Sequence, residues 1–591
     1  MKIPKFIAYA TLLCSGAALC AEASAQQYRT TDIRDMALIY QGGSHRLDWT
    51  VEEFRPYVVH EYADGERDWL FDGFLFLEFK NGSGRNYTVG YEKLNARRGE
   101  WEWLLGRIFE QGKSLSALDQ CIGEEIARLG KPGFTHRIVL GLPEAIRGQK
   151  DWGELDGRTM DFSDEKDQIA ATRWYIDQLI ERFRAAHYKH LELAGFYWVA
   201  EDTNHCEDLT IPLSDYIHSQ GYLFYWIPYW QAKGAGEWQR LGFDIAYQQP
   251  NHFFNHAIPD SRLDDACAFA REHGMAMEFE FDEKATLDRE DTSHGRMKAY
   301  IDHFEKNDVF NTSALAYYCG NRGVLTLHES KNPQDKALMD RLARLIQMRR
   351  YLQTGYPGKV STRVVAHRGY WRTEGSAQNS IASLLKADEL GVWGVEFDVW
   401  LAADGVPVLN HDGWHDGYKV PDTPSTVLTG LRLENGEPLP TLAQYLDAAR
   451  ATKVELVLEL KPHETPKQET RAAEEVVRMI DERKLAKRTT YITFSRHAML
   501  EFIRLAPKGT QVLYLGNDIA PEELKRLGAA GGDYNYWVYQ GNPSWLDYMK
   551  REKMISNVWT VDNPLEMIRT IRQGIDYITT DRPELFLQLA K

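Results

Sequence analysis

The feature that most constrains the fold is a regular alternation of short apolar strands with amphipathic helices. In the first half of the chain, helices such as 168–187 and 260–273 separate the predicted strands. The eight strands are predicted at 36–41, 73–79, 137–142, 193–200, 223–228, 245–249, 275–281 and 315–318. Strands that alternate with helices run parallel and are joined by right-handed crossovers, so eight of them favour a (β/α)8 barrel.

The same alternation begins again after a helix at 334–352 and a linker at 354–363 that contains Gly355, Pro357 and Gly358. The second set of strands is predicted at 364–367, 394–399, 455–460, 490–494, 511–515, 534–539, 557–561 and 577–579. A chain of 591 residues is also too long for one ordinary core. We therefore predict an α/β protein with two TIM-type (β/α)8 barrels in tandem, at 26–353 and 364–591.

Residues 1–25 are predicted to be a secretory signal peptide that is cleaved from the mature chain. Lys2 and Lys5 precede an apolar run at 7–19, and small residues at 23–25 precede Gln26. A lipoprotein at Cys20 is the less favoured alternative, because Leu19 occupies a position where a small residue is expected. No later segment approaches twenty consecutive apolar residues, so no transmembrane helix is expected. These features predict a periplasmic or extracellular protein.

Charge and cysteine spacing narrow the kinds of ligand. The net charge of −16 argues against a nucleic-acid partner, because phosphate backbones select basic surfaces. This negative net charge remains compatible with a small phosphodiester that is bound at a local metal ion. The four cysteines beyond the signal peptide are widely spaced and form no CxxC pair, which argues against a zinc site and leaves either disulfides or buried thiols: Cys121, Cys206, Cys267 and Cys319.

Chemically active side chains follow the first three strands of the second barrel. His367 and Arg368 end the first strand, Glu396 and Asp398 share a face of the second, and Glu459 ends the third. Active sites of parallel barrels lie at these carboxyl ends. Each residue alone is most often structural, but their joint occurrence favours a site. Three carboxylates on neighbouring strand ends would suit Mg²⁺ or Ca²⁺.

In combination these motifs resemble the glycerophosphodiester phosphodiesterases, over residues 364–591. The segments that carry the resemblance are His367-Arg368-Gly369, Gln378-Asn379-Ser380, Glu396-x-Asp398, Asp404-Gly405 with His411-Asp412, Glu459-Leu460-Lys461, Trp559-Thr560-Val561-Asp562 and Thr579-Thr580-Asp581-Arg582-Pro583. One departure is Gln378, where the family usually has Glu, and this puts metal preference or substrate in doubt.

The resemblance implies a TIM barrel that hydrolyses a phosphodiester with one divalent cation, Ca²⁺ or Mg²⁺. By resemblance Glu396, Asp398 and Glu459 hold the metal, and His367 and His411 form the acid–base pair. The remaining implied contacts, to phosphate or substrate, come from Arg368, Lys461 and Trp559. Histidine suits either role because it titrates near neutrality.

The first barrel resembles a bacterial domain family of unknown function. Glu201 and Glu280 follow its fourth and seventh strands, where a retaining glycosidase needs an acid/base and a nucleophile. Aromatic residues are expected beside them, at Trp198, Trp226, Tyr229 and Trp230. The alternatives are a barrel that only binds glycan and an acidic rim without a reaction, because fold alone does not give function.

Three hypotheses for the whole protein follow. The first is a phosphodiesterase that acts on a glycerophosphodiester or on a related, glycan-linked phosphodiester. The second is a glycosidase whose second barrel only binds, and the third is a non-enzymatic glycan-binding protein. The His367/His411 pair and the three carboxylates favour the first.

Overall fold

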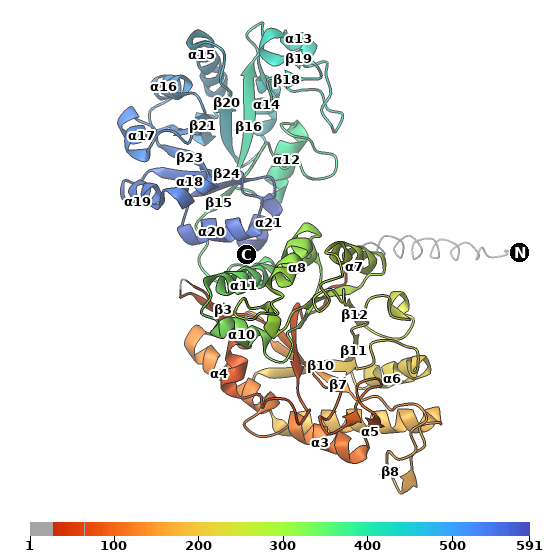
Figure 1. Ribbon diagram of the computed structural model, residues 1–591. Helices are drawn as coiled ribbons and strands as arrows, with labels where there is room; N and C mark the ends of the chain where they lie inside the picture. Colours follow the sequence, from red (N-terminus) through yellow and green to blue (C-terminus); the bar gives the residue numbers. More distant parts are fainter. Residues whose placement is uncertain (1–27, 64) are drawn as a thin grey trace, which may run out of the picture. The chain divides into compact units, whose positions relative to one another are not determined.

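The computed structural model describes residues 28–63 and 65–591, so the predicted signal peptide at 1–25 lies outside the described residues. The chain divides into two compact units between Arg349 and Arg350 (Figure 1). Each unit is built around its own barrel of parallel strands.

The first unit is a closed eight-stranded barrel, as the alternation of strands and helices predicted. Its strands pair in the order β1-β14-β13-β12-β11-β10-β7-β4. Their bounds are β1 (Asp35–Tyr40), β4 (Gly73–Leu77), β7 (His136–Leu142), β10 (Leu191–Trp198), β11 (Leu223–Trp226), β12 (Ile245–Gln248), β13 (Ala276–Glu280) and β14 (Leu315–Tyr318). The longer helices of this unit are α3 (Arg98–Ile108), α4 (Ser114–Leu129), α5 (Glu165–Ala186), α6 (Glu207–Ser219), α7 (Ser261–Glu272), α8 (His294–Lys306) and α11 (Pro333–Thr354).

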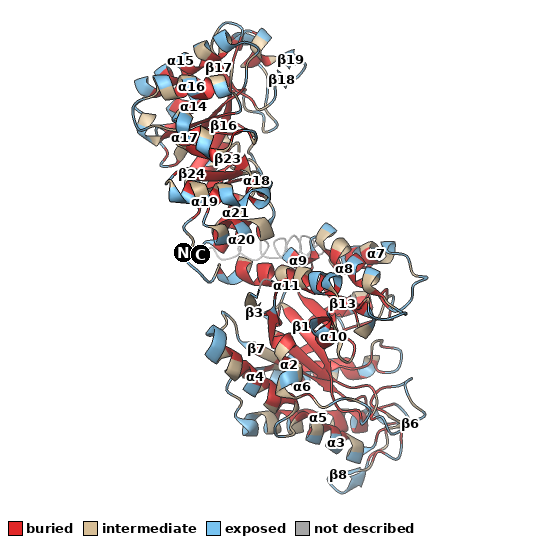
Figure 2. Ribbon diagram, turned by 60° about the vertical axis from the view of Figure 1, so that its left-hand side comes forward, coloured by how far each residue is buried: buried red, intermediate tan, exposed pale blue. Residues whose placement is uncertain are grey.

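Strand alternation decides which aromatic rings enter the first barrel. Successive side chains of a strand point to opposite faces. Tyr197 and Tyr225 therefore join the interior cluster, whereas Trp198 and Trp226 pack outward against Phe224 and Phe243. The expectation that these two tryptophans stand beside the carboxylates is wrong, and tyrosines take that place. Figure 2 shows the strands of the barrel almost wholly buried.

The second unit contains a second closed ring of eight parallel strands. Its strands are β15 (Arg363–Ala366), β16 (Gly394–Leu401), β20 (Glu455–Leu460), β21 (Thr489–Thr493), β22 (Gln511–Tyr514), β23 (Gly531–Asn535), β24 (Ile555–Trp559) and β25 (Tyr577–Thr580). The pairings β15–β25 and β15–β16 close the ring. A ninth strand that was not predicted, β17 (Pro407–Leu409), pairs antiparallel with the outer part of β16.

The sixth strand of this ring lies earlier than predicted. A strand was expected at 534–539, but β23 ends at Asn535 and helix α18 (Tyr536–Gly541) follows. Glycine is required at Gly531, because a Cβ there would lie 1.9 Å from the carbonyl oxygen of Ile555 on β24. The Asn535 side chain caps the helix by accepting a hydrogen bond from the backbone N–H of Trp537. Glycine and aspartate are poor strand formers by composition, which is why the pattern favoured the aromatic residues after them.

The four cysteines at 121, 206, 267 and 319 are buried free thiols, which decides between the two alternatives left by their spacing. A search of residues 28–63 and 65–591 finds no helix long and apolar enough to cross a membrane.

Candidate active site

Three carboxylates come together at the carboxyl end of the second barrel. Glu396 and Asp398 lie on one face of β16, and Glu459 lies on the neighbouring strand β20, where it pairs in register with Asp398. Each of the three offers an oxygen, and these oxygens lie within 4.8 Å of one another. All three side chains are buried. Among the described residues this is the only such group of metal-ligating side chains.

Mutual repulsion and burial shape the ionisation of this cluster. Burial, with the neighbouring charges of Asp398 and Glu459, raises the pKa of Glu396 well above its usual range. Burial and Asp398 also raise the pKa of Glu459 to about 7. Burial opposes ionisation of Asp398 too, but the ammonium of Lys461 holds its pKa below the usual value. Burial and mutual repulsion thus oppose full ionisation of the three carboxyl groups, and Lys461 offsets this only in part.

This cluster fits a hard divalent cation. The Oε1 atom of Glu396 is buried and has no hydrogen-bond partner among the described residues. Carboxylate oxygens are the ligands that Ca²⁺ and Mg²⁺ take, and such an ion favours the ionised form of each ligand. Glu396, Asp398 and Glu459 are therefore the residues that could hold it.

His367 follows β15 directly, and its ring is fixed from behind. Its Nδ1 lies 2.8 Å from Oδ1 of Asp581. Asp581 follows β25, the strand that pairs with β15. An ionised carboxylate only accepts, so Nδ1 donates and Nε2 is left free. Nε2 lies 3.9 Å from Oε2 of Glu396 and so faces the carboxylate cluster. Asp581 was not among the predicted site residues.

His411 reaches the same cavity from the segment after β17. Its Nδ1 lies 2.7 Å from Oδ1 of Asp412, which is largely exposed. Burial of the ring lowers the pKa of His411, although the charge of Asp398 opposes the shift. Both predicted histidines therefore line one cavity, each with Nδ1 bound to a carboxylate.

The two cations at the site contact the carboxylates. Nζ of Lys461 lies 2.7 Å from Asp398 Oδ1 and 2.8 Å from Glu459 Oε1. Arg368 has a left-handed backbone with φ of 55°, and its N–H donates to Glu396 Oε2 at 2.8 Å. Its guanidinium donates to the amide oxygen of Gln378 at 2.6 Å. The residue that departs from the family pattern thus binds Arg368 and does not touch the carboxylates directly.

The cavity around these groups has a volume of about 120 Å³ and a partly aromatic wall. Trp559 lines it, stands edge-on to Phe494, and donates from Nε1 to the carbonyl oxygen of Asp533 at 2.9 Å. The Asp533 side chain also lines the cavity, and burial raises its pKa well above the usual range. Asp533 was not predicted as a site residue, because the predicted strand began one residue after it.

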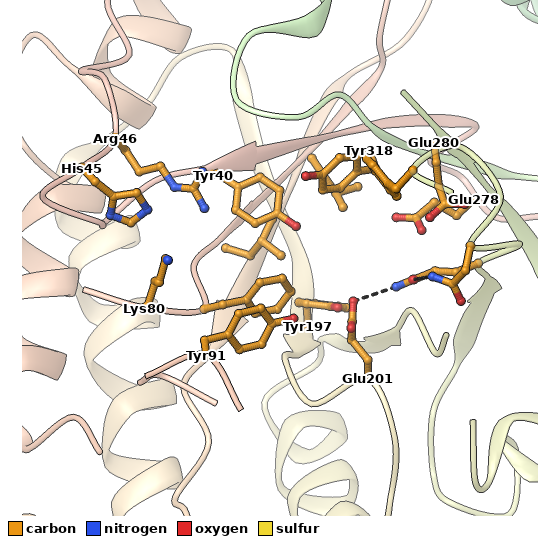
Figure 3. A pocket seen from close by; sticks show the side chains of 16 residues that line it. Tyr40, His45, Arg46, Lys80, Tyr91, Tyr197, Glu201, Glu278, Glu280 and Tyr318 are labelled. Carbon is orange, nitrogen blue, oxygen red and sulfur yellow. Dashed lines mark hydrogen bonds between the residues drawn. The ribbon is translucent and has the colours of Figure 1, made fainter. Parts of the chain in front are cut away.

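In the first barrel, Glu201 and Glu280 lie in one cavity of about 520 Å³ at the carboxyl ends of the strands (Figure 3). Glu278 lies two residues before Glu280 on the same face of β13 and lines the same cavity. The other acidic residues near the strand ends have structural partners: Glu78 binds Arg46, and Glu144 accepts a hydrogen bond from Thr88. Asp202 accepts one from Tyr229.

Comparison with known proteins gives a family for each unit. Residues 367–585 match the model of the glycerophosphoryl diester phosphodiesterase family, and residues 35–344 match a domain of unknown function, DUF4855. A glycerophosphodiester phosphodiesterase of Caldanaerobacter subterraneus subsp. tengcongensis is 26% identical over 247 residues, which are 39% of this chain and 99% of that relative.

Two solved structures illustrate the range of similarity. A glycerophosphodiester phosphodiesterase from Parabacteroides distasonis is 50% identical, with 39% of this chain and 98% of that chain covered and a TM-score of 0.39. A phosphodiesterase from Oleispira antarctica, solved with the product sn-glycerol-3-phosphate, is 25% identical, with 38% and 96% covered and a TM-score of 0.34. The chain thus belongs to the DUF4855 family through residues 35–344, and its residues 367–585 match the glycerophosphoryl diester phosphodiesterase family, so that its second barrel is a phosphoric diester hydrolase.

Proposed function

We propose that the second barrel hydrolyses a glycerophosphodiester, or a related glycan-linked phosphodiester, with one divalent cation and with His367 and His411 as its acid–base pair. The observation that carries this proposal is the cluster of Glu396, Asp398 and Glu459, whose oxygens lie within 4.8 Å of one another in a cavity lined by both histidines.

Charge in the cavity supports a metal-assisted reaction. When all three carboxyl groups are ionised, as binding of a metal ion requires, their charge outweighs that of the two cations Lys461 and Arg368 and would by itself repel a phosphodiester anion. A divalent cation held by the carboxylates would reverse that balance and neutralise the non-bridging oxygens of the substrate. Ca²⁺ and Mg²⁺ both suit an all-oxygen ligand set.

The histidines supply the proton transfers. An alkoxide is a poor leaving group, so one imidazolium must donate a proton to the departing oxygen. The nucleophile, water or a neighbouring hydroxyl of the alcohol, must lose a proton to the other imidazole. The Nδ1 contact of each ring with a carboxylate leaves Nε2 for this work. Asp581 is then a positioning residue that sets the tautomer of His367.

The site of action is part of the proposal. Lys2, Lys5 and the apolar run at 7–19 support export through a signal peptide, with action in the periplasm or outside the cell. The test is the amino terminus of the protein recovered from the periplasm or medium. A start at Gln26 supports cleavage, and intact protein confined to the cytoplasm contradicts it.

Metal dependence is tested with chelated enzyme and glycerophosphocholine as the probe. Chelation should abolish hydrolysis, and Ca²⁺ or Mg²⁺ should restore it. Glu396→Ala and Asp398→Ala should behave like chelated enzyme at any metal concentration while their circular dichroism stays that of the parent. Full activity after chelation would exclude the proposed metal role.

A glycan-linked substrate is distinguished by a second probe. A sugar-linked glycerophosphodiester should be hydrolysed with a higher kcat/KM than glycerophosphocholine if the alcohol is a glycan. A higher kcat/KM for glycerophosphocholine would instead identify a simple glycerophosphodiester as the substrate.

A further inference from the structure

Several polar side chains that line the cavity of the first barrel have no hydrogen-bond partner among the described residues. Glu278 is 2% exposed, and its carboxylate accepts no hydrogen bond from any residue that the structure describes. The hydroxyl groups of Tyr40 and Tyr197, both buried, likewise have no hydrogen-bond partner within residues 28–63 and 65–591. All three side chains line the cavity, and Figure 3 shows them around one space. Buried polar groups are normally hydrogen-bonded, so these groups face a space suited to a polar ligand.

The three carboxyl groups in this cavity differ in their hydrogen bonds. Glu280 accepts from the Tyr300 hydroxyl and, at 3.3 Å, from the backbone N–H of His252. Glu201 accepts from Nε2 of Gln249 at 2.8 Å. The donors on Glu280 favour its ionised form, whereas Glu278 has no such support.

Electrostatics keeps these groups from ionising together. Burial raises the pKa of Glu280 to about 7 despite its donors, and the charge of Glu201 adds to the shift. Burial also raises the pKa of Glu201. Burial and the charges of Glu280 and Glu201 raise the pKa of Glu278 well above its usual range. Burial and mutual repulsion thus oppose the simultaneous ionisation of the three groups, so a protonated carboxyl group can stand beside a carboxylate in this cavity.

A metal site does not explain this group. Within the part of the chain that the structure describes, Glu396, Asp398 and Glu459 are the only three metal-ligating side chains with atoms within 4.8 Å of one another. Glu201, Glu278 and Glu280 do not form such a group, so a metal site is not the reason for the acidic lining of this cavity.

The aromatic rim indicates the class of ligand. Tyr91 is 44% exposed and stacks on Phe79, with ring centroids 4.7 Å apart. Phe254 is 50% exposed and stands edge-on to Tyr318, with centroids 5.3 Å apart. Both exposed rings line the cavity together with its polar residues. A sugar ring matches this lining, because it has apolar C–H faces and a rim of hydroxyl groups.

We propose that the first barrel is a retaining glycoside hydrolase, with Glu201 as its acid/base, Glu280 as its nucleophile and Glu278 as the buried acid beneath the sugar. The proposal goes beyond the phosphodiesterase function and does not depend on it, because the two cavities are lined by residues of different barrels.

The reaction consumes one water and needs no other reactant. First, the glycosidic bond between C1 and the leaving oxygen breaks, that oxygen takes the proton of Glu201, and the Glu280 carboxylate bonds to C1. Then a water oxygen bonds to C1, Glu201 takes one water proton, and the bond between Glu280 and C1 breaks. Both carboxyl groups return to their starting states.

The experiment uses the full chain and a panel of 4-methylumbelliferyl glycosides that covers both anomers of hexoses, pentoses and N-acetylhexosamines. At least one glycoside should release methylumbelliferone. Glu280→Ala should lower kcat/KM at least a hundredfold, and azide should restore turnover as a glycosyl azide of inverted configuration. Glu201→Ala with azide should give the azide of retained configuration. The matched control is Glu290→Gln, an exposed glutamate outside the cavity, which should behave like the parent.

Two outcomes would overturn the proposal. One is no release from any glycoside by a preparation in which both units unfold cooperatively in urea, since that transition shows the first barrel to be folded. The other is glycoside hydrolysis that survives Glu280→Ala. Loss of phosphodiester hydrolysis alone would count against the second barrel and leave this proposal standing, so the two failures are distinguishable.

Discussion

His367 and His411 line one cavity, and an aspartate binds the ring of each, but the two aspartates differ in their exposure to solvent. The carboxylate that binds His367 is 12% exposed, whereas the one that binds His411 is 77% exposed. Burial weakens competition from water, so Asp581 orients its histidine more firmly than Asp412 does. The two rings are therefore suited to different roles, which kinetics can separate.

Leaving-group dependence should identify the general acid. A nitrophenolate departs without a proton, so loss of the acid should cost much less on a nitrophenyl phosphodiester than on a glycerophosphodiester. Loss of the base should cost about the same on both. One of His367→Ala and His411→Ala should therefore be rescued by the better leaving group, as measured by kcat/KM. If neither variant slows glycerophosphodiester hydrolysis by at least roughly a hundredfold, the histidines are structural.

Glu280 should make the stability of the first barrel depend on pH. Its folded pKa of about 7 lies above the ordinary value of 4.5. The favourable contribution of protonated Glu280 to the free energy of unfolding is therefore complete below about pH 4.5, and it is lost as the pH rises through about 7. Glu280→Gln removes this loss, so the variant should gain stability relative to the parent between pH 5 and pH 8, by on the order of 2 kcal/mol.

The measurement is urea unfolding of both proteins at several pH values, with Glu290→Gln as the exposed control. A difference between Glu280→Gln and the parent that does not change with pH would mean that Glu280 ionises as an exposed carboxyl group does.

At the scale of elements, the turn between β15 and helix α12 (Ile381–Leu390) orients a proposed metal ligand. Asn379 donates from Nδ2 to Asp398 Oδ2 at 2.8 Å and accepts from the backbone N–H of Asp398 at 3.0 Å. It has a left-handed backbone with φ of 57°, a conformation that asparagine and glycine adopt more readily than alanine. One residue thus fixes both the turn and the carboxylate.

Asn379→Gly and Asn379→Ala should both weaken metal binding by roughly 10–100-fold, because both lose the amide that orients Asp398. Only the alanine variant should also lose about 1 kcal/mol of stability, through its strained backbone. Calorimetric titration with Ca²⁺ and urea unfolding measure the two effects. Parent-like Ca²⁺ affinity in Asn379→Gly would show that the amide does not orient the ligand.

Helix α11 is held to the first barrel by a buried arginine. Arg349 is fully buried, lies 3.0 Å from Oδ1 of Asp35 on β1, and donates to the carbonyl oxygens of Phe310 and Ser313 at 2.6 and 2.7 Å. Tyr317 donates to the same aspartate at 2.7 Å. The network joins the helix to the first and last strands of the barrel.

Arg349→Met should destabilise the first barrel by about 3–5 kcal/mol, because it leaves a buried carboxylate without its cation. Arg341→Met on the same helix is the matched control. Arg341 is partly exposed and pairs with Asp302 and Glu305, so its loss should cost at most about 1 kcal/mol. Urea unfolding compares the two. Equal effects would mean that the buried network does not hold the helix.

At the scale of the whole molecule, each barrel has its own cavity, and a separate reaction is proposed for each. Chelation should stop phosphodiester hydrolysis, which the metal cluster supports, and leave glycoside hydrolysis unchanged, because no metal is proposed in the first barrel. Conversely, Glu201→Gln should stop only glycoside hydrolysis. Both activities can be followed in one sample. Parallel loss of both under either treatment would contradict two independent sites.

Much of this architecture follows from the sequence by itself. Strand and helix periods and the order of elements depend on local residue patterns, so all eight strands of the first barrel and seven of the second were located closely. Motifs at strand ends located Glu396, Asp398 and Glu459, because residues two apart on one strand must share a face. The shared face of Glu396 and Asp398 needed only neighbours along the chain, whereas the approach of Glu459 to Asp398 also depends on the pairing of β16 with β20.

Other features were decided only by the closure of the strands into a barrel. Asp581 lies 214 residues from His367 in sequence, and the pairing of β25 with β15 brings the two together. Tyr40 and Tyr197 face the first cavity, while Trp198 is turned outward by the pleat. Glu278 lines the same cavity as Glu280, two residues further along β13, because alternate residues of the strand face the barrel interior. Such contacts depend on strand register and on ring closure, which local residue patterns do not encode.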